Sequence, residues 1–281
     1  MTTDFPLDDV KISEVAICRQ VESPAHASGG WQVSSDAFSM QVEQVGSFYT
    51  AGGAEAEYSV LPGADPGWVR LYLHGQVVVA LLHQRGVISF HASSFVHEGQ
   101  GLMILGESGA GKSSLAASFA LGGAGLMTDD ITPVVFRGEV PVILSLHGSI
   151  RIRRNTAAQL NIDGELLREA ESGTEKQYMR ARREGVTEYP LHVVMKVEIG
   201  EARVPVFDEP SPAEKFAFLR SEICMSEILA GMPETETAYL HQIVRMIEKV
   251  HFIRVVRPAE IRITEMHSAV SEYLESLSGK G

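Results

Sequence analysis

The sequence is poor in cysteine and has no long apolar run. Its two cysteines, Cys18 and Cys224, lie far apart and form no C-x-x-C pair, so neither a disulfide framework nor a zinc site is indicated. The longest apolar runs, such as "VVVALL" at residues 77–82, fall well short of the roughly 20 residues that a bilayer crossing needs. The first ten residues, "MTTDFPLDDV", lack the basic and apolar regions of a secretory signal. We therefore predict a cytoplasmic protein without a membrane segment.

Basic residues are also scarce. There are 24 Lys and Arg against 36 Asp and Glu, which gives a formal net charge of −12. Nucleic acids and anionic membrane surfaces need clustered positive charge, so we expect neither of them as a partner. The 281 residues, of which 44% are hydrophobic, are enough to bury a sizeable core, and this excludes a disordered chain.

The chain is expected to have two parts. Residues 1–70 contain short β-like stretches, such as "FSMQVEQV" and "EAEYSVL", which are separated by glycine-rich turns. After residue 140 strands alternate with polar connectors, and from Pro212 the chain is predicted to be helical, with Leu240, Ile243, Val244, Ile247 and Val250 on one helix face. We predict an α/β fold with a small N-terminal β layer over residues 1–70. Residues 71–281 are predicted to form a core with a mixed sheet and C-terminal helices.

The segment "GESGAGKSS" at residues 106–114 fits the pattern G-x-x-x-x-G-K-[ST]. An apolar strand, "GLMILG", precedes it, and a run of helix formers, "KSSLAASFAL", follows it, which is the context that makes the motif specific. Glycines let main-chain N–H groups surround phosphate oxygens at the start of a helix. The sequence therefore predicts a P-loop core that binds ATP or GTP. The expected nucleotide contacts are Gly106, Glu107, Ser108, Gly109, Ala110, Gly111, Lys112, Ser113 and Ser114.

Several residues near this loop have side chains suited to phosphoryl transfer. Lys112 is expected to reach the β and γ phosphates, and Ser113 to ligate Mg²⁺. Asp129 and Asp130 end the strand after the loop helix, at the edge where open α/β sheets bind ligands. One carboxylate would help to hold the metal, and the other would accept the proton of an attacking hydroxyl. The alternative is that "TDD" is only a turn.

His91 lies in the strand "VISFHASSF", where its imidazole could meet the two aspartates. A histidine in a strand is otherwise often a hydrogen-bonded core residue. Two basic clusters stand out on so acidic a chain, "RIRR" at residues 151–154 and "RARR" at residues 180–183. Alternation places Arg151 and Arg153 on one strand face, which makes them candidates for contact with phosphate or substrate. The alternative for both clusters is a solvated strand edge and an exposed loop.

The combination of His91, "GESGAGKS" and "TDD" resembles the HPr kinase/phosphorylase family, whose nucleotide core is related to ATP-dependent phosphoenolpyruvate carboxykinase. In that family a histidine lies 21 residues before the loop lysine, as His91 does here before Lys112. The resemblance implies that Asp130 is the general base and that His91 orients or tunes it. We expect Ser113 and Asp129 to place Mg²⁺. The likeness extends from about residue 70 to about residue 270 and is specific between residues 86 and 133.

The sequence departs from this family at two points. Asn155 stands where an acidic metal ligand is expected, 43 residues after Lys112, and the segment associated with phosphorolysis has no counterpart. Short members of the family include kinases that phosphorylate a serine of precursor peptides. The resemblance thus implies a homo-oligomeric serine kinase for a protein or peptide, with ATP and Mg²⁺ as cofactors. A small-molecule kinase, and a module that binds ATP as a signal without turnover, are the alternatives.

Overall fold

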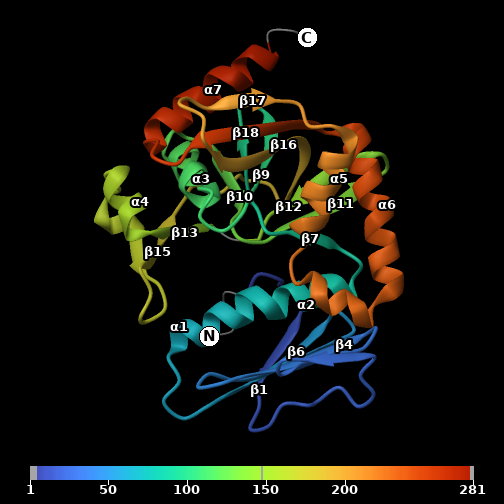
Figure 1. Cartoon of the computed structure of the whole chain (residues 1–281). Helices are drawn as coiled ribbons and strands as arrows, with labels where there is room; N and C mark the ends of the chain where they lie inside the picture. The colour runs from blue at the N-terminus through green and yellow to red at the C-terminus, as the bar shows by residue number, and fades with distance from the viewer. Residues whose placement is uncertain (1–4, 147, 279–281) are drawn as a thin grey trace. The chain divides into compact units, whose positions relative to one another are not determined.

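The computed structural model describes residues 5–146 and 148–278, and the mixed α/β class expected from the sequence is confirmed (Figure 1). The chain divides into two compact units. The first comprises Met1–Ser89, Glu171–Thr174 and Ile223–Ile243, and the second comprises Phe90–Ala170, Glu175–Glu222 and Val244–Gly281. These units do not coincide with the regions 1–70 and 71–281, which stay predictions as functional domains.

The first unit contains a sheet with the strand order β1-β6-β5-β4-β3-β2. Strands β2 to β6 form antiparallel pairs, and β1 pairs with β6 in parallel. Aromatic side chains on successive strands, Phe38, Phe48 and Tyr58, are almost fully buried and fix one face of this sheet. The strands are β1 (Lys11–Glu14), β2 (His26–Ser28), β3 (Trp31–Val33), β4 (Ala37–Val42), β5 (Gly46–Ala51) and β6 (Glu55–Val60).

A helical segment follows this sheet in the chain and belongs to the same unit. It consists of α1 (Pro66–Tyr72), a π-helical turn η2 (Leu73–Val77) and α2 (Val78–Gln84). Asp65 caps α1 by accepting a hydrogen bond from the Gly67 N–H, and Pro66 occupies the first turn, where its missing N–H costs nothing. Every residue of α2 except Gln84 is buried, as the apolar sequence predicts.

Residues 223–243 complete the first unit although they lie far away in the sequence. They contain the 3-10 helix η4 (Ser226–Gly231) and most of α6 (Pro233–Lys249). The buried ring of His83 joins both ends of this segment to α2, since Nε2 donates to Cys224 O (2.8 Å) and Nδ1 lies 3.0 Å from the Tyr239 hydroxyl. Gly231 packs so closely that a Cβ there would lie 2.5 Å from Val33 Cγ1.

The main sheet of the second unit has the order β10-β8-β9-β16-β12-β11, with β18 paired to β16 and β17 to β18. Strands β9, β16 and β18 are parallel, and the other pairs are antiparallel, so the sheet is mixed. The short strand β7 (Ile88–Phe90) crosses the boundary between the units in the sequence. The other strands are β8 (Ser93–His97), β9 (Gln100–Leu105), β10 (Gly125–Thr128), β11 (Thr132–Arg137), β12 (Val140–Leu144), β16 (Glu188–Gly200), β17 (Val206–Asp208) and β18 (His251–Pro258).

A second, smaller sheet of this unit has the order β13-β15-β14. It consists of β13 (Ser149–Arg153), β14 (Leu167–Glu169) and β15 (Lys176–Arg180). The helices of the second unit, with the 3-10 helix η3, are α3 (Lys112–Leu121), α4 (Arg154–Gln159), η3 (Gly164–Leu166), α5 (Pro212–Ser221) and α7 (Ile263–Ser278).

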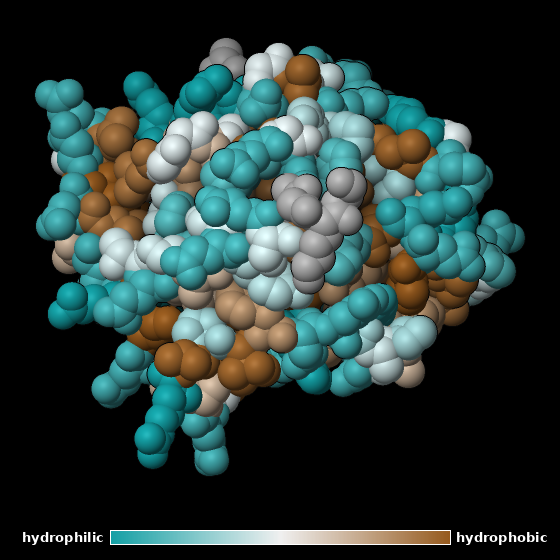
Figure 2. All heavy atoms as spheres, turned by 90° about the horizontal axis from the view of Figure 1, so that it is seen from above, coloured by the Kyte–Doolittle hydropathy of each residue, from teal (hydrophilic) through white to brown (hydrophobic). Residues whose placement is uncertain are grey.

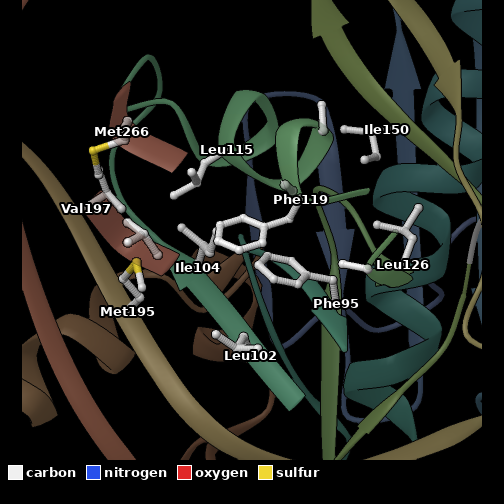
Figure 3. Close-up of a cluster of buried hydrophobic side chains, with 14 of the residues drawn as sticks. Phe95, Leu102, Ile104, Leu115, Phe119, Leu126, Ile150, Met195, Val197 and Met266 are labelled. Atoms are coloured by element: carbon white, nitrogen blue, oxygen red, sulfur yellow. The ribbon is translucent and has the colours of Figure 1, made fainter. Parts of the chain in front are cut away.

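The core of the second unit joins α3 to both sheets (Figure 3). The rings of Phe95 on β8 and Phe119 on α3 stack with centroids 4.9 Å apart. Ile150 from β13 and Met266 from α7 are buried in the same cluster. Because α3 is packed on several sides, the loop at its N-terminus starts from a fixed position.

Hydrophilic residues predominate on the face of the molecule that Figure 2 shows, and hydrophobic residues occupy several separate areas of it. In the part of the chain that the structure describes, no helix combines the length and the apolar character needed to cross a membrane.

Candidate active site

The loop of residues 106–111 connects β9 to α3 in the strand, loop and helix order expected from the sequence. Gly109 and Gly111 have φ angles of 91° and 104°, which other residues rarely adopt. A Cβ on Gly106 would lie 2.5 Å from Val197 O, so only glycine fits beside β16. The first N–H groups of α3 have no partner within the helix and are available to an anion at the loop.

Strand directions explain why distant residues meet near this loop. Because β8 is antiparallel to β9, and β10 is antiparallel to β8, the start of β8 and the end of β10 lie at the same sheet edge as the end of β9. His91 precedes β8, and Asp129 and Asp130 follow β10. The order of strands thus brings all three residues to the edge where the loop begins.

Lys112 is the first residue of α3, and only 6% of it is exposed. Its Nζ donates a hydrogen bond to Gly106 O across the loop, at 2.5 Å. Burial lowers the pKa of Lys112, while the nearby carboxylates of Glu222, Asp130 and Asp129 act in the opposite direction. The ammonium therefore lies inside the loop and close to acidic groups.

Asp129 is buried and fully engaged in hydrogen bonds. Its Oδ1 accepts from Ser93 Oγ (2.5 Å) and its Oδ2 from the backbone N–H of Arg151 (2.8 Å). The Ser113 side chain acts to lower the pKa of this carboxylate. Burial, and secondly the charge of Asp130, raise the pKa of Asp129 to about 7. A buried carboxylate of this kind gains stability from a cation.

Asp130 occupies the centre of a tight turn. Its φ is 66°, and the Ile131 N–H donates to Asp129 O at 2.9 Å, which closes a three-residue turn around it. His91 Nε2 lies 3.9 Å from Asp130 Oδ1, with both side chains nearly half exposed. Burial and the Lys112 charge lower the pKa of His91, so the imidazole is neutral at neutral pH. The His91 backbone N–H donates to Glu222 O at 2.7 Å.

The remaining predicted residues have other neighbours. Ser114 Oγ lies 2.8 Å from Thr156 Oγ1 of α4, and so points away from the loop. Arg151 is half-buried and reaches Asp129 through its backbone, whereas Arg153 is exposed and immediately precedes α4. Asn155 lies in α4 and is exposed, and its side chain accepts a hydrogen bond from Gln159.

Lys196 and Glu222 belong to this site but escaped the sequence interpretation. Lys196 Nζ lies 2.7 Å from Glu222 Oε1, and the two side chains are only 8% and 9% exposed. Lys196 on β16 is in register with Leu105, the last residue before the loop. A lysine inside the apolar run "HVVMKVEI" was a visible signal, because lysine is seldom buried without a partner. Glu222 gave no such signal.

Arg257, at the end of β18, holds the loop from another side. Its Nε donates to Ala110 O (2.8 Å) and its Nη2 to Gly109 O (3.4 Å). Burial lowers the pKa of this guanidinium.

The residues that follow Arg257 in the chain line a cavity of about 490 Å³, which is large enough for part of a nucleotide. The cavity is lined by Gln159, Glu260, Ile261, Arg262 and Thr264.

No family model matches the sequence, and no curated protein matches it. Among solved structures, the chain is similar to the Hpr(Ser) kinase/phosphatase from Coxiella burnetii, with a TM-score of 0.36 and 14% sequence identity. The match covers 69% of this chain and 99% of the other chain. This is a distant likeness of fold and is too slight for an argument about function. The functional conclusion therefore rests on the geometry of the site.

Proposed function

We propose that this protein is a kinase that transfers the γ-phosphoryl group of ATP to a serine hydroxyl of a protein or peptide. The observation that supports this most directly is the meeting of three groups at one edge of the main sheet. These groups are the loop lysine Lys112, Asp129 with the Ser113 side chain that acts on its pKa, and Asp130 beside His91. Phosphoryl transfer depends mainly on positioning and charge stabilisation, so this small set is sufficient.

The loop and Lys112 would hold the nucleotide. Loop N–H groups and the start of α3 attract phosphate oxygens, and Lys112 Nζ exchanges its bond to Gly106 O for the β and γ phosphates. The cavity beyond Arg257 is a candidate site for the nucleoside. Residues 260–262, which line the cavity, come shortly after Arg257, and Arg257 donates a hydrogen bond to the loop. Gln159, which also lines the cavity, belongs to α4, and α4 is joined to α3 by the hydrogen bond between Thr156 and Ser114.

Ser113 and Asp129 fit the requirements of Mg²⁺. A hydroxyl and a carboxylate are oxygen donors of the type that hard cations prefer. Within residues 5–146 and 148–278, no three His, Cys, Asp or Glu side chains form a metal cluster, so phosphates and water would supply the other ligands. When bound, the ion offsets the negative charge of the phosphates.

Asp130 is suited to act as the base. Its carboxylate is exposed enough for an acceptor to approach, and Lys112 and His91 adjoin it. As the serine oxygen bonds to the γ phosphorus, Asp130 takes the hydroxyl proton and the bond to the bridging oxygen of ADP breaks. Neutral His91 would orient the carboxylate. We assign Asp129 to the metal because it is the buried member of the pair.

The test is Asp130→Asn, because asparagine accepts a positive φ and keeps the turn. We expect the variant to bind ATP with unchanged affinity by calorimetry, while phosphoserine formation falls by about 100-fold or more. The substrates are small proteins and precursor peptides encoded beside the gene, and the readout is mass spectrometry. Unchanged turnover would refute the role of Asp130. If γ-labelled ATP is used, label on a metabolite would identify a small-molecule kinase. Tight ATP binding without any labelled acceptor would identify a signalling module.

A further inference from the structure

The small sheet β13-β15-β14 has one strongly basic face. In its register Ser149, Arg151 and Arg153 of β13 lie opposite Arg180, Tyr178 and Lys176 of β15, and Arg168 of β14 lies opposite Tyr178. Residues directly opposite each other in an antiparallel pair share a face. We call this set the basic face; it comprises Ser149, Arg151, Arg153, Arg168, Lys176, Tyr178 and Arg180. Five of its seven members are cationic.

The opposite face of the same sheet fixes this orientation. Ile150, Ile152 and Met179 alternate with the basic residues and are buried in the core of the second unit, where Figure 3 shows Ile150. A shift of register by one residue would bury arginines instead, so the apolar core determines where the charges point. Arg153, Arg168 and Arg180 are exposed, and Arg151 and Lys176 are half-buried.

Four of the five cationic residues of the basic face, Arg153, Arg168, Lys176 and Arg180, have little compensating charge among the described residues. Glu169 lies on the opposite face, where it pairs with Arg154 and accepts a hydrogen bond from Gln177. Within the described part of the chain, no carboxylate forms an ion pair with Arg153, Arg168, Lys176 or Arg180. Like charges on adjacent strands repel each other. On a protein with a net charge of −12, such a cluster indicates an anionic partner.

The basic face begins at the candidate active site. The Arg151 N–H donates to Asp129 Oδ2, so β13 lies beside Asp129. Lys176, which lies opposite Arg153 on the same face, is one of the charges that lower the pKa of His91, after burial and Lys112. A polypeptide bound along the basic face would therefore pass by Asp130 and His91.

We propose that the basic face binds an acidic segment of the acceptor polypeptide and thereby places its serine at Asp130. This inference rests on the proposed kinase function and adds the class of acceptor. Arginine forks match carboxylates, which favours acidic side chains over neutral ones. Neighbouring strands are about 4.8 Å apart, and alternate residues of one strand are about 7 Å apart. Because the basic residues have this spacing, we expect the acidic residues of the acceptor polypeptide to lie within a few positions of its serine.

The experiment compares three fluorescein-labelled peptides of equal length, each with one central serine flanked by Glu, Gln or Lys. Binding is measured by fluorescence anisotropy without nucleotide. We expect the Glu peptide to bind about tenfold more tightly than the Gln peptide at about 50 mM salt, and this preference to shrink at about 500 mM salt. The variant R168E/R180E should lose the preference.

Two controls accompany this variant. Arg203→Glu reverses a charge at an exposed position between β16 and β17 and should keep the preference. R168K/R180K retains the charge and should keep most of the preference, which separates a charge effect from damage to the sheet. Equal affinity of the Glu and Gln peptides for the wild-type protein, or an equal loss in Arg203→Glu, would overturn the proposal. Stronger competition by an oligothymidylate of matching charge would overturn it as well and would indicate nucleic acid.

The same peptides distinguish this proposal from the kinase function. With ATP and Mg²⁺ added, transfer to the Glu and Gln peptides at equal rates would reject the docking role and retain the kinase. Binding of the Glu peptide by the wild-type protein, without phosphate on its serine after incubation with ATP and Mg²⁺, would retain an acidic docking surface and reject the kinase.

Discussion

Asp130 shows at the level of a single residue how the site is prepared. A φ of 66° is uncommon for a residue with a Cβ and costs on the order of 1 kcal/mol or more. The turn persists because its neighbours are firmly held: Asp129 by Ser93 and Arg151, and Thr132 by a hydrogen bond to Ala92 O. The strained residue is the one that the sequence motif marks as the base.

The sequence identified the residues of the site better than it identified their partners. Lys112, Ser113 and the aspartates could be proposed as site residues because a local pattern of strand, loop and helix predicts roles for them. The hydrogen bond from Ser93 to Asp129, the ion pair of Lys196 and Glu222 and the contact of Arg257 with the loop could not. Each joins residues that lie at least 26 positions apart, and no local pattern encodes such a pair.

His83 provides a test of stability against pH. Burial lowers the pKa of His83 from 6.5 to about 4, so the folded protein favours the neutral ring. The stabilisation is therefore complete above pH 6.5 and is lost as the pH falls towards 4, by up to about 3 kcal/mol. We expect His83→Gln to flatten the pH dependence of the free energy of unfolding in this range, as measured by urea titration. If the free energy of unfolding depends on pH equally in the wild-type protein and in His83→Gln, the lowered pKa of His83 would be contradicted.

At the level of elements, the helices illustrate what periodicity can and cannot give. The helix predicted around Leu240 and Val250 corresponds to α6. The prediction that Val244 lies on its buried face was wrong, because Val244 is 48% exposed. The buried residues are Tyr239, Ile243, Met246 and Val250. Tyr239 was missed because its burial depends on the hydroxyl, which donates to Val87 O and meets the ring of His83. A tertiary hydrogen bond thus allows a residue with a polar group to join the buried face of the helix.

Strand β18 positions the loop through Arg257, and this leads to a prediction about nucleotide affinity. Arg257→Met removes the donors to the carbonyls of Ala110 and Gly109 and leaves the loop less ordered. We expect the Kd for ATP, measured by calorimetry, to rise about tenfold. The matched control is Arg254→Met on the same strand, which removes ion pairs to Asp208 and Glu214 and should leave the Kd unchanged. Equal effects of the two variants would argue against a specific contact with the loop.

At the level of the whole molecule, the first unit is not a continuous stretch of sequence. Composition suggested a division that follows the chain in order, whereas residues 223–243 fold with the first 89 residues. Ile228, Leu229 and Tyr239 are fully buried in this arrangement. Their partners can be recognised only from contacts in space, because the intervening residues form most of the second unit.

This organisation predicts that removal of residues 1–89 leaves a fragment that aggregates. A fragment of residues 90–281 would expose the apolar side chains of residues 223–243 to water. We expect the fragment to bind the dye ANS and to aggregate during size-exclusion chromatography, whereas the full chain does neither. A monomeric fragment with a cooperative thermal transition would contradict this expectation.

The distance in sequence between the two parts of the first unit also determines how long the first part waits for the second during synthesis on the ribosome. About 130 residues separate Ser89 from Ile223. At a synthesis rate of roughly 5–20 residues per second, the ribosome needs about 7 to 27 seconds to make them. During this interval the nascent β layer and α2 lack the segment that later contacts them, through Gly231 beside Val33 and Tyr239 beside His83. Protection by a chaperone is therefore most useful to this chain while it is still being translated.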